Sequence, residues 1–337
     1  MDTAVSGLLQ TTKETDMIRA VIAATCASLI ASAPHALAQA WPSKPVRLVV
    51  PFATGGTTDI LARLYAQRLT EALGTQFIVD NRAGAGGTIG TEAGARSAPD
   101  GYTFVFGSTS STVVSPGLYP RLSFDIVRDF VPIAEVASAS IVLAAHPTLP
   151  ARNVKELVAL ARARPGEIVF ASSGNGSSLH LCAEYLKYLA KIDMVHVPYK
   201  GVGPALPDLL AGQVQLLFSD MPPFVPYIKT GRLRALGVTT ARRSPLLPDI
   251  APIAEAVPGY DLAGWYGVLA PAGTPSDIVN RLHAEIRKIM LSPQMKERYV
   301  ALAIEPVERT PQQFGEYVKA ELGKWGKIIQ VSGARIQ

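Results

Sequence analysis

Residues 46–59 of this 337-residue chain read VRLVVPFATGGTTD. The β-branched, apolar start of this stretch predicts a buried strand, and the apolar spacing after Asp59 predicts a helix. The main-chain N–H groups at the start of a helix lack intrahelical partners and carry partial positive charge, so the glycine-rich turn between them can bind a carboxylate or a phosphate. A plain turn in which Asp59 caps its own helix is an equally open interpretation.

Two later turns repeat this pattern. Glu167–Ala171 predicts a strand, and SSGNGSS at residues 172–178 then leads into another apolar helical repeat. Thr103–Phe106 predicts a strand that is followed by GSTSST at residues 107–112. Ligands of α/β proteins bind beyond the carboxyl ends of the strands, so we expect these turns to share a ligand site. A capped turn that faces solvent is the alternative.

The rest of the chain alternates short β-branched runs with helical repeats, which predicts an α/β fold with parallel strands. Helix starts are indicated at Asn153, Thr274 and Thr310, because each is followed three residues later by an acid or an amide. The expected strands are Val46–Val50, Gln76–Val79, Thr103–Phe106, Ile141–Ala145, Glu167–Ala171, Met194–Pro198, Val214–Phe218, Arg234–Val238 and Tyr266–Ala270.

The chain has neither a solenoid repeat nor a low-complexity linker, so two domains would have to be joined by strands. The segments best suited to pass from one domain to the other are residues 137–143 and 264–269. We call them the two crossings, and they predict a hinge of two strands. This division gives a discontinuous first domain, residues 39–140 plus 263–337, and a second domain, residues 141–262.

The N-terminal segment has the composition of a secretory signal. A short basic region begins at Met17, residues 20–30 are apolar, and Ala36–Ala38 fits the small-residue cleavage pattern. The apolar run is shorter than the ~20 residues that span a bilayer. We therefore expect residues 1–38 to be a cleaved signal peptide, with Met17 as an alternative start, and the mature chain to be exported to the periplasm.

The composition argues against several classes of function. The formal net charge of +5 is not gathered into a basic stripe, so nucleic-acid binding is not expected. The sequence lacks a phosphate-binding P-loop, a zinc-type cluster of His and Cys, and a serine nucleophile elbow, so we expect no cofactor, no metal and no catalytic residue. Cys182 reads as a packing residue on an apolar helical face.

Two further strand ends carry polar candidates. Tyr199 follows one predicted strand, in VPYKG at residues 197–201, and Asp220 follows another. Asp220 could orient a hydroxyl or an amine of a ligand, or it could cap the turn before Pro222. The sequence is compatible with both roles of Asp220.

The order of these motifs resembles the Bug-type substrate-binding proteins of tripartite tricarboxylate transporters. The resemblance runs from residue 41 to the C-terminus, through WPxxPVR at 41–47, PFxxGGxxD at 51–59, DNRxGAGG at 80–87, DGYT at 100–103, SSGxGS at 172–177 and VPYKG at 197–201. It implies a periplasmic binding protein of the type II, Venus-flytrap architecture, whose two α/β domains close on a small carboxylate without catalysis. It also implies that the loops 52–59 and 172–178 hold that carboxylate from opposite sides, largely through main-chain amides and water.

These observations predict an exported receptor that captures a small carboxylate in an interdomain cleft and delivers it to the membrane subunits of a tripartite permease. A di- or tricarboxylate, an aromatic acid and an acidic amino acid all fit, and a monomer is expected. The expected ligand-binding residues are Phe52, Thr54, Gly55, Gly56, Thr57, Asp59, Ser108, Thr109, Ser172, Ser173, Asn175, Ser177, Ser178, Tyr199 and Asp220.

Two alternatives from other classes remain open. One is a periplasmic hydrolase or isomerase of small organic acids that uses Asp59, His180 or Asp220 as its general base. The other is a sensor component, in which the loaded protein docks on a signalling receptor such as a sensor kinase.

Overall fold

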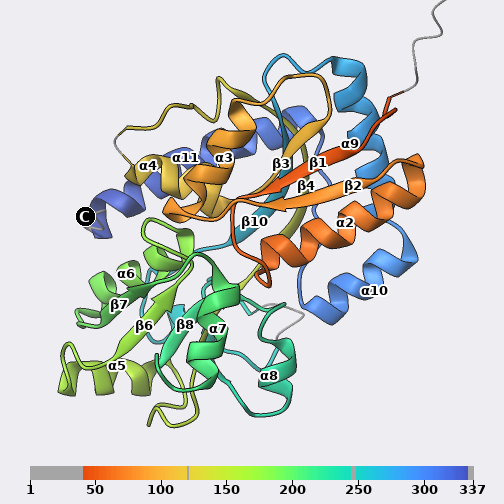
Figure 1. The fold of residues 1–337 in the computed structure, drawn as a ribbon. Helices are drawn as coiled ribbons and strands as arrows, with labels where there is room; N and C mark the ends of the chain where they lie inside the picture. The colour runs from red at the N-terminus through yellow and green to blue at the C-terminus, as the bar shows by residue number, and fades with distance from the viewer. Residues whose placement is uncertain (1–40, 120, 244–247, 333–337) are drawn as a thin grey trace, which may run out of the picture. The chain divides into compact units, whose positions relative to one another are not determined.

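Two five-stranded sheets with flanking helices make up the fold in the computed structural model, which describes residues 41–119, 121–243 and 248–332 (Figure 1). All of these strands lie in one compact unit that begins at Lys44. The first sheet has the order β2-β1-β3-β10-β4, with β1 (Val46–Val50), β2 (Phe77–Asn81), β3 (Thr103–Ser108), β4 (Phe130–Ala139) and β10 (Gly264–Pro271). The second has the order β7-β6-β8-β5-β9, with β5 (Ile141–Ala145), β6 (Val169–Ser172), β7 (Val195–Pro198), β8 (Leu216–Asp220) and β9 (Arg234–Val238).

The helices follow the strands in both halves of the chain. They are α2 (Thr57–Leu73), α3 (Thr88–Ala95), α4 (Ser115–Leu118), α5 (Val154–Ala163), α6 (Ser178–Ala190), α7 (Val202–Leu210), α8 (Val225–Lys229), α9 (Ser276–Met290), α10 (Pro293–Leu302) and α11 (Pro311–Ser332). In the part of the chain that the structure describes, each helix is too short or too polar to span a bilayer.

Both sheets are built on the same topology. In the first, β1-α2-β2-α3-β3 places β1 between its two parallel neighbours, and in the second, β6-α6-β7-α7-β8 does the same with β6. The starts of α2 and α6, which follow the two central strands, are therefore equivalent positions. Each is a topological switch point, where α/β proteins bind ligands.

The prediction of parallel strands is only partly correct, because each sheet contains one reversed strand. β10 pairs antiparallel with β3 and β4, and β5 pairs antiparallel with β8 and β9. The chain crosses from β4 to β5 through Ser140 alone, and it returns from β9 to β10. A strand that enters a sheet at the edge where the parallel strands end must run away from that edge, which reverses its direction.

Each predicted strand is present, with ends shifted by two residues at most. The sequence analysis did not predict β4 as a strand. Only its last residues, from 137 on, were expected, as part of the first crossing between the domains. Its polar Glu135 breaks the apolar pattern, yet the residue is buried and its carboxylate is paired with the Arg309 guanidinium. An ion pair with a residue so far along the chain leaves no signal in the local sequence.

Two of the predicted helix starts are confirmed by their side-chain caps. Asn153 Oδ1 accepts a hydrogen bond from Glu156 N at 2.9 Å. Thr310 and Gln313 form a reciprocal capping box, with bonds of 3.0 and 3.2 Å. The third was wrong, since the hydroxyl of Thr274 instead donates to the preceding turn and α9 begins one residue later than expected.

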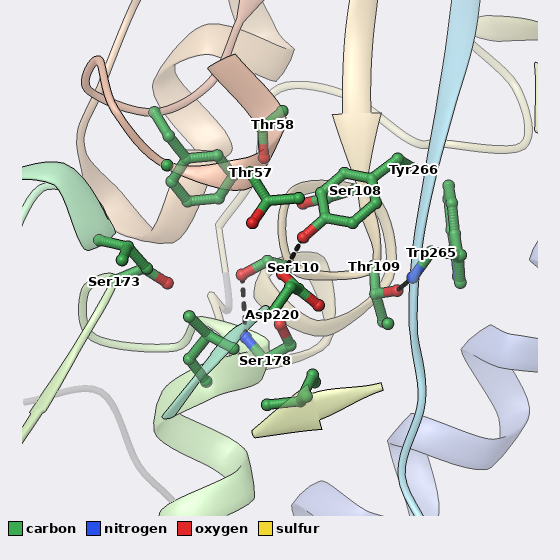
Figure 2. Close-up of a pocket in the computed structure, with 16 residues that line it drawn as sticks. Thr57, Thr58, Ser108, Thr109, Ser110, Ser173, Ser178, Asp220, Trp265 and Tyr266 are labelled. Carbon is green, nitrogen blue, oxygen red and sulfur yellow. Dashed lines mark hydrogen bonds between the residues drawn. The ribbon is translucent and has the colours of Figure 1, made fainter. Parts of the chain in front are cut away.

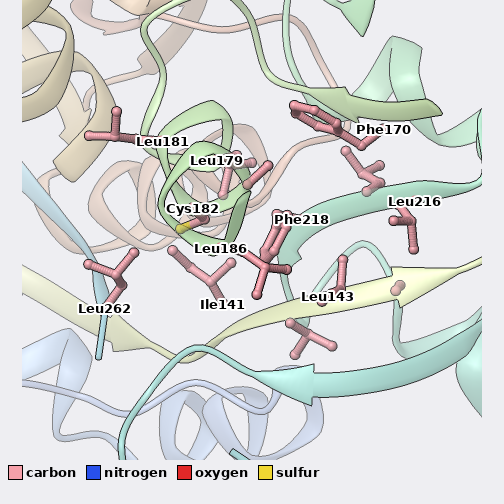
Figure 3. Close-up of a cluster of buried hydrophobic side chains, with 14 of the residues drawn as sticks. Ile141, Leu143, Phe170, Leu179, Leu181, Cys182, Leu186, Leu216, Phe218 and Leu262 are labelled. Atoms are coloured by element: carbon pink, nitrogen blue, oxygen red, sulfur yellow. The ribbon is translucent and has the colours of Figure 1, made fainter. Parts of the chain in front are cut away.

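Helix α6 packs its apolar face against the second sheet (Figure 3). Leu179, Cys182 and Leu186 on this helix lie over Ile141 of β5 and Phe218 of β8, and all five side chains are buried. Burying a leucine side chain of this kind contributes about 1.5–3 kcal/mol. Because burial raises the pKa of the Cys182 thiol, this side chain packs as a small apolar group, as the sequence predicts.

Helix α11 returns to the first sheet and packs against β10. The Trp265 indole meets the Phe314 ring edge-on, with ring centroids 5.3 Å apart. Gly267, two residues further along β10, has no room for a side chain, because a Cβ there would overlap the Phe314 ring and lie 2.9 Å from the carbonyl oxygen of Ala134.

Replacing Gly267 with Ala should lower the free energy of unfolding by about 1–3 kcal/mol, the usual cost of overpacking a core. The matched control is Gly323→Ala in α11, where no heavy atom lies within 4 Å of the added methyl group. That control should raise the free energy of unfolding by ~0.5–1 kcal/mol. Urea denaturation of the two variants measures both changes, and equal stabilities would contradict the close packing of α11 on β10.

Candidate ligand-binding pocket

The strand ends of both sheets and the starts of α2 and α6 surround a small pocket (Figure 2). Its volume of 40 Å³ is room for about three water molecules. The lining residues are Phe52, Gly56, Thr57, Thr58, Ser108, Thr109, Ser110, Ile141, Ser173, Ser178, Leu179, Val202, Asp220, Gly264, Trp265 and Tyr266.

The first turn of α2 presents main-chain N–H groups that no side chain caps. Gly56 is the N-cap residue and offers no acceptor to them. Gly56, Thr57 and Thr58 all line the pocket. The hydroxyl of Thr57 is buried and has no hydrogen-bond partner within the described part of the chain. Together with the partial positive charge of the helix end, these donors suit an anionic oxygen.

Asp59 lies behind this turn and holds its shape. Its Oδ2 atom accepts hydrogen bonds from Gly55 N and Arg63 Nε, both at 3.0 Å. Asn81 Nδ2 donates to Asp59 Oδ1 at 3.0 Å and to the carbonyl oxygen of Phe52 at 2.9 Å. Asp59 therefore positions the turn without lining the pocket, and it does not cap the first-turn N–H groups of α2, because the main-chain N–H that it binds belongs to Gly55, ahead of the helix.

The serine-rich turn before α6 approaches the pocket from the second sheet. Ser177 is the N-cap residue, and its hydroxyl accepts from His180 N at 3.1 Å. Ser173 and Ser178 line the pocket. Ser178 N donates to Ser110 Oγ at 2.9 Å, which joins this turn to the turn that follows β3.

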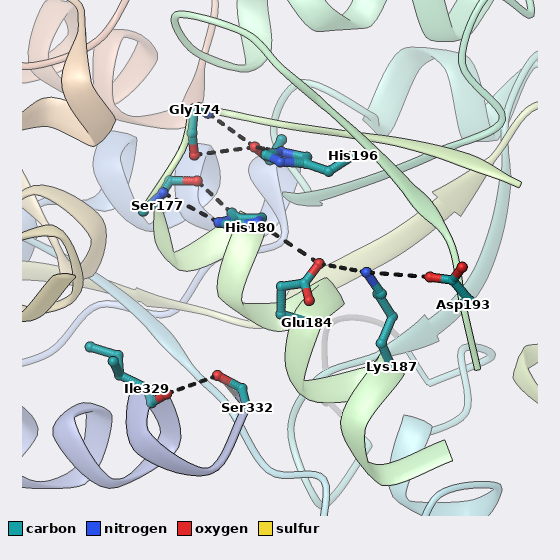
Figure 4. A network of polar contacts seen from close by, with 11 residues as sticks. Gly174, Ser177, His180, Glu184, Lys187, Asp193, His196, Ile329 and Ser332 are labelled. Carbon is teal, nitrogen blue, oxygen red and sulfur yellow. Dashed lines mark hydrogen bonds and ion pairs between the residues drawn. The ribbon is translucent and has the colours of Figure 1, made fainter. Parts of the chain in front are cut away.

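Two stacked histidines support the serine-rich turn from behind (Figure 4). The rings of His180 and His196 are 4.0 Å apart and nearly parallel. Gly176 N donates to His180 Nδ1 at 3.3 Å, and Ser172 Oγ is 2.6 Å from His196 Nε2. Burial lowers the pKa of His180 to about 4 and that of His196 to about 3, so both rings are neutral at pH 7.

Several predicted site residues lie outside the pocket lining. The carbonyl oxygen of Asn175 accepts from Tyr119 Oη at 3.1 Å, and Tyr199 Oη donates to Asp208 Oδ2 at 2.5 Å. The residues outside the lining are Thr54, Gly55, Asp59, Ser172, Asn175, Ser177 and Tyr199. Those that line it are Phe52, Gly56, Thr57, Ser108, Thr109, Ser173, Ser178 and Asp220.

Sequence reasoning missed half of the lining. Thr58 and Ser110 lie in turns that the sequence singled out, so their hydroxyls were within reach of that reasoning. Gly264, Trp265 and Tyr266 come from β10, whose sequence carries no local sign of a ligand. The remaining residues that were missed are Ile141, Leu179 and Val202.

Asp220 is the one carboxyl group among the lining residues, which include neither Lys nor Arg. Its Oδ2 atom accepts a hydrogen bond from the Tyr266 hydroxyl. Its Oδ1 atom is buried and unpartnered within the described residues. Burial raises the pKa of Asp220 to about 6, and the Tyr266 hydrogen bond partly opposes that change.

The pocket offers hydroxyls, helix-end N–H groups and one carboxyl group. Of the three general-base candidates from the sequence, Asp220 lines it, whereas Asp59 and His180 lie behind the two turns. In the described ranges, no three His, Cys, Asp or Glu side chains gather in a way that could hold a metal ion. This arrangement can bind a small anion through neutral donors.

Replacing Asp220 with Asn tests the electrostatic state of the pocket. The pKa of Asp220 is about 6 in the folded chain, above the ordinary value of about 3.9 for an Asp. The folded state is therefore stabilised by protonation at low pH, and this contribution to the free energy of unfolding is lost as the pH rises from about 4 through 6. At pH 7 the ionised carboxylate lowers the free energy of unfolding by about 3 kcal/mol relative to the protonated group. The amide oxygen of Asn still accepts from Tyr266, so the variant should be more stable than the native chain at pH 7 and lose this advantage at pH 4. Urea denaturation at both pH values measures it, and a pH-independent difference would contradict the raised pKa.

Comparison with known proteins shows the family to which this chain belongs. Residues 61–334 match the family model described as the tripartite tricarboxylate transporter family receptor. BugT of Bordetella pertussis is 36% identical over 302 residues, which are 89% of this chain and 93% of BugT.

Solved structures show the same architecture. A Rhodopseudomonas palustris protein, Rpa4515, solved with adipate, has a TM-score of 0.85 and 38% identity, covering 88% of this chain and 100% of that one. MatC from the same organism, solved with bound malate, has a TM-score of 0.82 and 31% identity, covering 86% and 100%. The periplasmic binding protein BugD has a TM-score of 0.84 and 33% identity, covering 88% and 100%. These matches confirm the two-domain α/β fold, and this chain belongs to the family of tripartite tricarboxylate transporter receptors, which are periplasmic solute-binding proteins and not enzymes.

Proposed function

We propose that this chain is an exported receptor that captures a small carboxylate in the pocket between its two sheets and delivers it to the membrane subunits of a tripartite permease. The observation that carries the proposal is the uncapped start of α2, whose N–H groups meet a hydroxyl-lined pocket in a member of this receptor family. The relatives solved with adipate and malate support a carboxylate as the ligand.

The energetics of the pocket agree with an anion held by neutral groups. A hydrogen bond to a charged group contributes roughly 1.5–3 kcal/mol net, so a few such bonds supply micromolar affinity without a cationic side chain. In this proposal the ligand carboxylate contacts the start of α2 and the hydroxyl groups around it. The proposed contact residues are Phe52, Gly56, Thr57, Ser108, Thr109, Ser173 and Ser178.

We further propose that ligand binding closes two domains, residues 39–140 plus 263–337 and residues 141–262, about a hinge at the two crossings. The single residue Ser140 between β4 and β5 supports a hinge at the first crossing. Ala53 N donates to the carbonyl oxygen of Lys200 at 3.1 Å, and Ser178 N to Ser110 Oγ at 2.9 Å, so hydrogen bonds join the two proposed domains. A ligand that contacts both sides favours the closed state.

Export rests on the sequence pattern, because residues 1–38 lie outside the described residues, and on the periplasmic location of the solved relatives. Delivery to a permease is preferred over docking on a sensor kinase, since the matching family is a transporter receptor. We propose that the receptor acts as a monomer.

Isothermal titration calorimetry of the purified chain against a panel of small carboxylates should give dissociation constants between nanomolar and micromolar for at least one member. Thr57→Val, which removes an unpartnered hydroxyl without changing the shape, should weaken that binding about tenfold and leave the free energy of unfolding nearly unchanged. The matched control is Thr230→Val, on an exposed turn away from the pocket. Silence across the panel, together with binding of a sugar or a phosphate ester, would contradict the proposal.

Closure is tested at Gly203, in the first turn of α7. A Cβ at this position would overlap the carbonyl oxygen of Thr54 in the turn before α2, although Ala is compatible with the helix itself. Gly203→Ala should therefore weaken carboxylate binding at least about tenfold, with the Gly323→Ala protein as its control. Small-angle X-ray scattering with saturating ligand should show a larger radius of gyration for the variant. An unchanged affinity would mean that this contact is not part of the bound state.

A further inference from the structure

Asp220 supplies a hydrogen-bond acceptor that the protein does not use. The residue ends β8 and is 5% exposed. Tyr266 donates to Oδ2, whereas Oδ1 has no partner in the part of the chain that the structure describes. A buried carboxylate oxygen without a donor is costly, and native proteins keep few such groups. A ligand that donates to Oδ1 would remove this cost.

The turn that follows Asp220 does not need this side chain. Phe224 N and Val225 N both donate to the carbonyl oxygen of Met221, at 2.8 and 3.0 Å. The main chain therefore closes the turn, which weighs against the interpretation that Asp220 is its cap. The carboxyl group is left to face the pocket that it lines.

A glycine of the facing strand lies next to Oδ1. A Cβ on Gly264, at the start of β10, would lie 3.0 Å from this oxygen. Thr57 lines the same pocket from the start of α2; its hydroxyl forms no hydrogen bond of normal length among the described residues, but it lies close enough to Asp220 to help lower the pKa of that carboxyl group. The pocket thus combines a helix end that favours a carboxylate with an acceptor that needs a donor.

A ligand that consists of carboxylates alone cannot satisfy both groups. Its oxygen atoms suit the N–H groups of α2, but next to an ionised Asp220 they would meet a like charge. A hydroxyl or ammonium group on the ligand would instead donate to Oδ1 and relieve the unpaired oxygen.

We propose that Asp220 Oδ1 accepts a hydrogen bond from a hydroxyl or ammonium group that the ligand carries close to its carboxylate. The receptor then selects hydroxy acids or amino acids over unsubstituted acids of the same length. This inference rests on the proposed carboxylate-binding function and names the substrate class within it.

Calorimetry with three matched sets of acids tests the selection. Each set shares one carbon skeleton: succinate, malate and aspartate; glutarate, 2-hydroxyglutarate and glutamate; adipate, 2-hydroxyadipate and 2-aminoadipate. In the set that binds, the hydroxy or amino acid should bind about tenfold or more tightly than the unsubstituted acid at pH 7. The better of the two identifies the donor as a hydroxyl or an ammonium group.

Asp220→Leu removes both acceptor oxygens at similar volume, and it should reduce the preference to within about threefold while the unsubstituted acid binds at least as well as before. Gly264→Ala, which crowds Oδ1 without changing Asp220, should also reduce the preference and serves if the first variant does not fold. The matched control is Ser219→Ala, because Ser219 is the buried neighbour on β8 and does not line the pocket. That control should keep the native preference.

Two outcomes would overturn the inference. One is equal or tighter binding of the unsubstituted acid by the native chain. The other is a preference that Asp220→Leu and Gly264→Ala both leave unchanged, since a group other than Asp220 Oδ1 would then accept the hydrogen bond. Binding without preference rejects the inference alone, whereas the absence of binding by every acid in the three sets also rejects the carboxylate-receptor function.

Discussion

The pocket depends on the main-chain N–H groups at the start of α2, which a glycine at the N-cap position leaves without a side-chain acceptor. Such donors retain their need for an acceptor wherever they are buried, and the helix dipole makes an anion the favoured one. The surrounding residues keep these N–H groups in place. Asp59 and Asn81 hold the turn from behind, and neither side chain lines the pocket.

The two halves of the molecule contribute to the pocket in different ways. The first sheet supplies the uncapped helix end, whereas the equivalent helix end in the second sheet is capped by Ser177 and tied to Ser110 through Ser178 N. The stacked, neutral His180 and His196 keep that second turn in place. The same topology, used twice, thus yields one side that suits an anion and one side that lies opposite and adds the acceptor Asp220.

The predicted strands, the capping boxes and the turns that approach the pocket were within reach of sequence reasoning, because each depends on residues a few positions apart. The individual contacts were not. Ser172 and Ser177 looked like ligand donors, yet one is beside His196 and the other caps α6. A hydroxyl in a serine-rich turn has several partners within reach, and only the folded arrangement selects among them.

The local sequence determined the fold class, the family and the position of the turns around the pocket, since strand, glycine-rich turn and helix are encoded by neighbouring residues. Tertiary structure alone decided that Asp220 meets Tyr266 and that its second oxygen is buried beside Gly264 without a donor among the described residues. These residues belong to β8 and β10, strands of different sheets that the two crossings bring together. Burial then raises the pKa of the carboxyl group, and burial is a property of the whole fold that no short stretch of sequence contains.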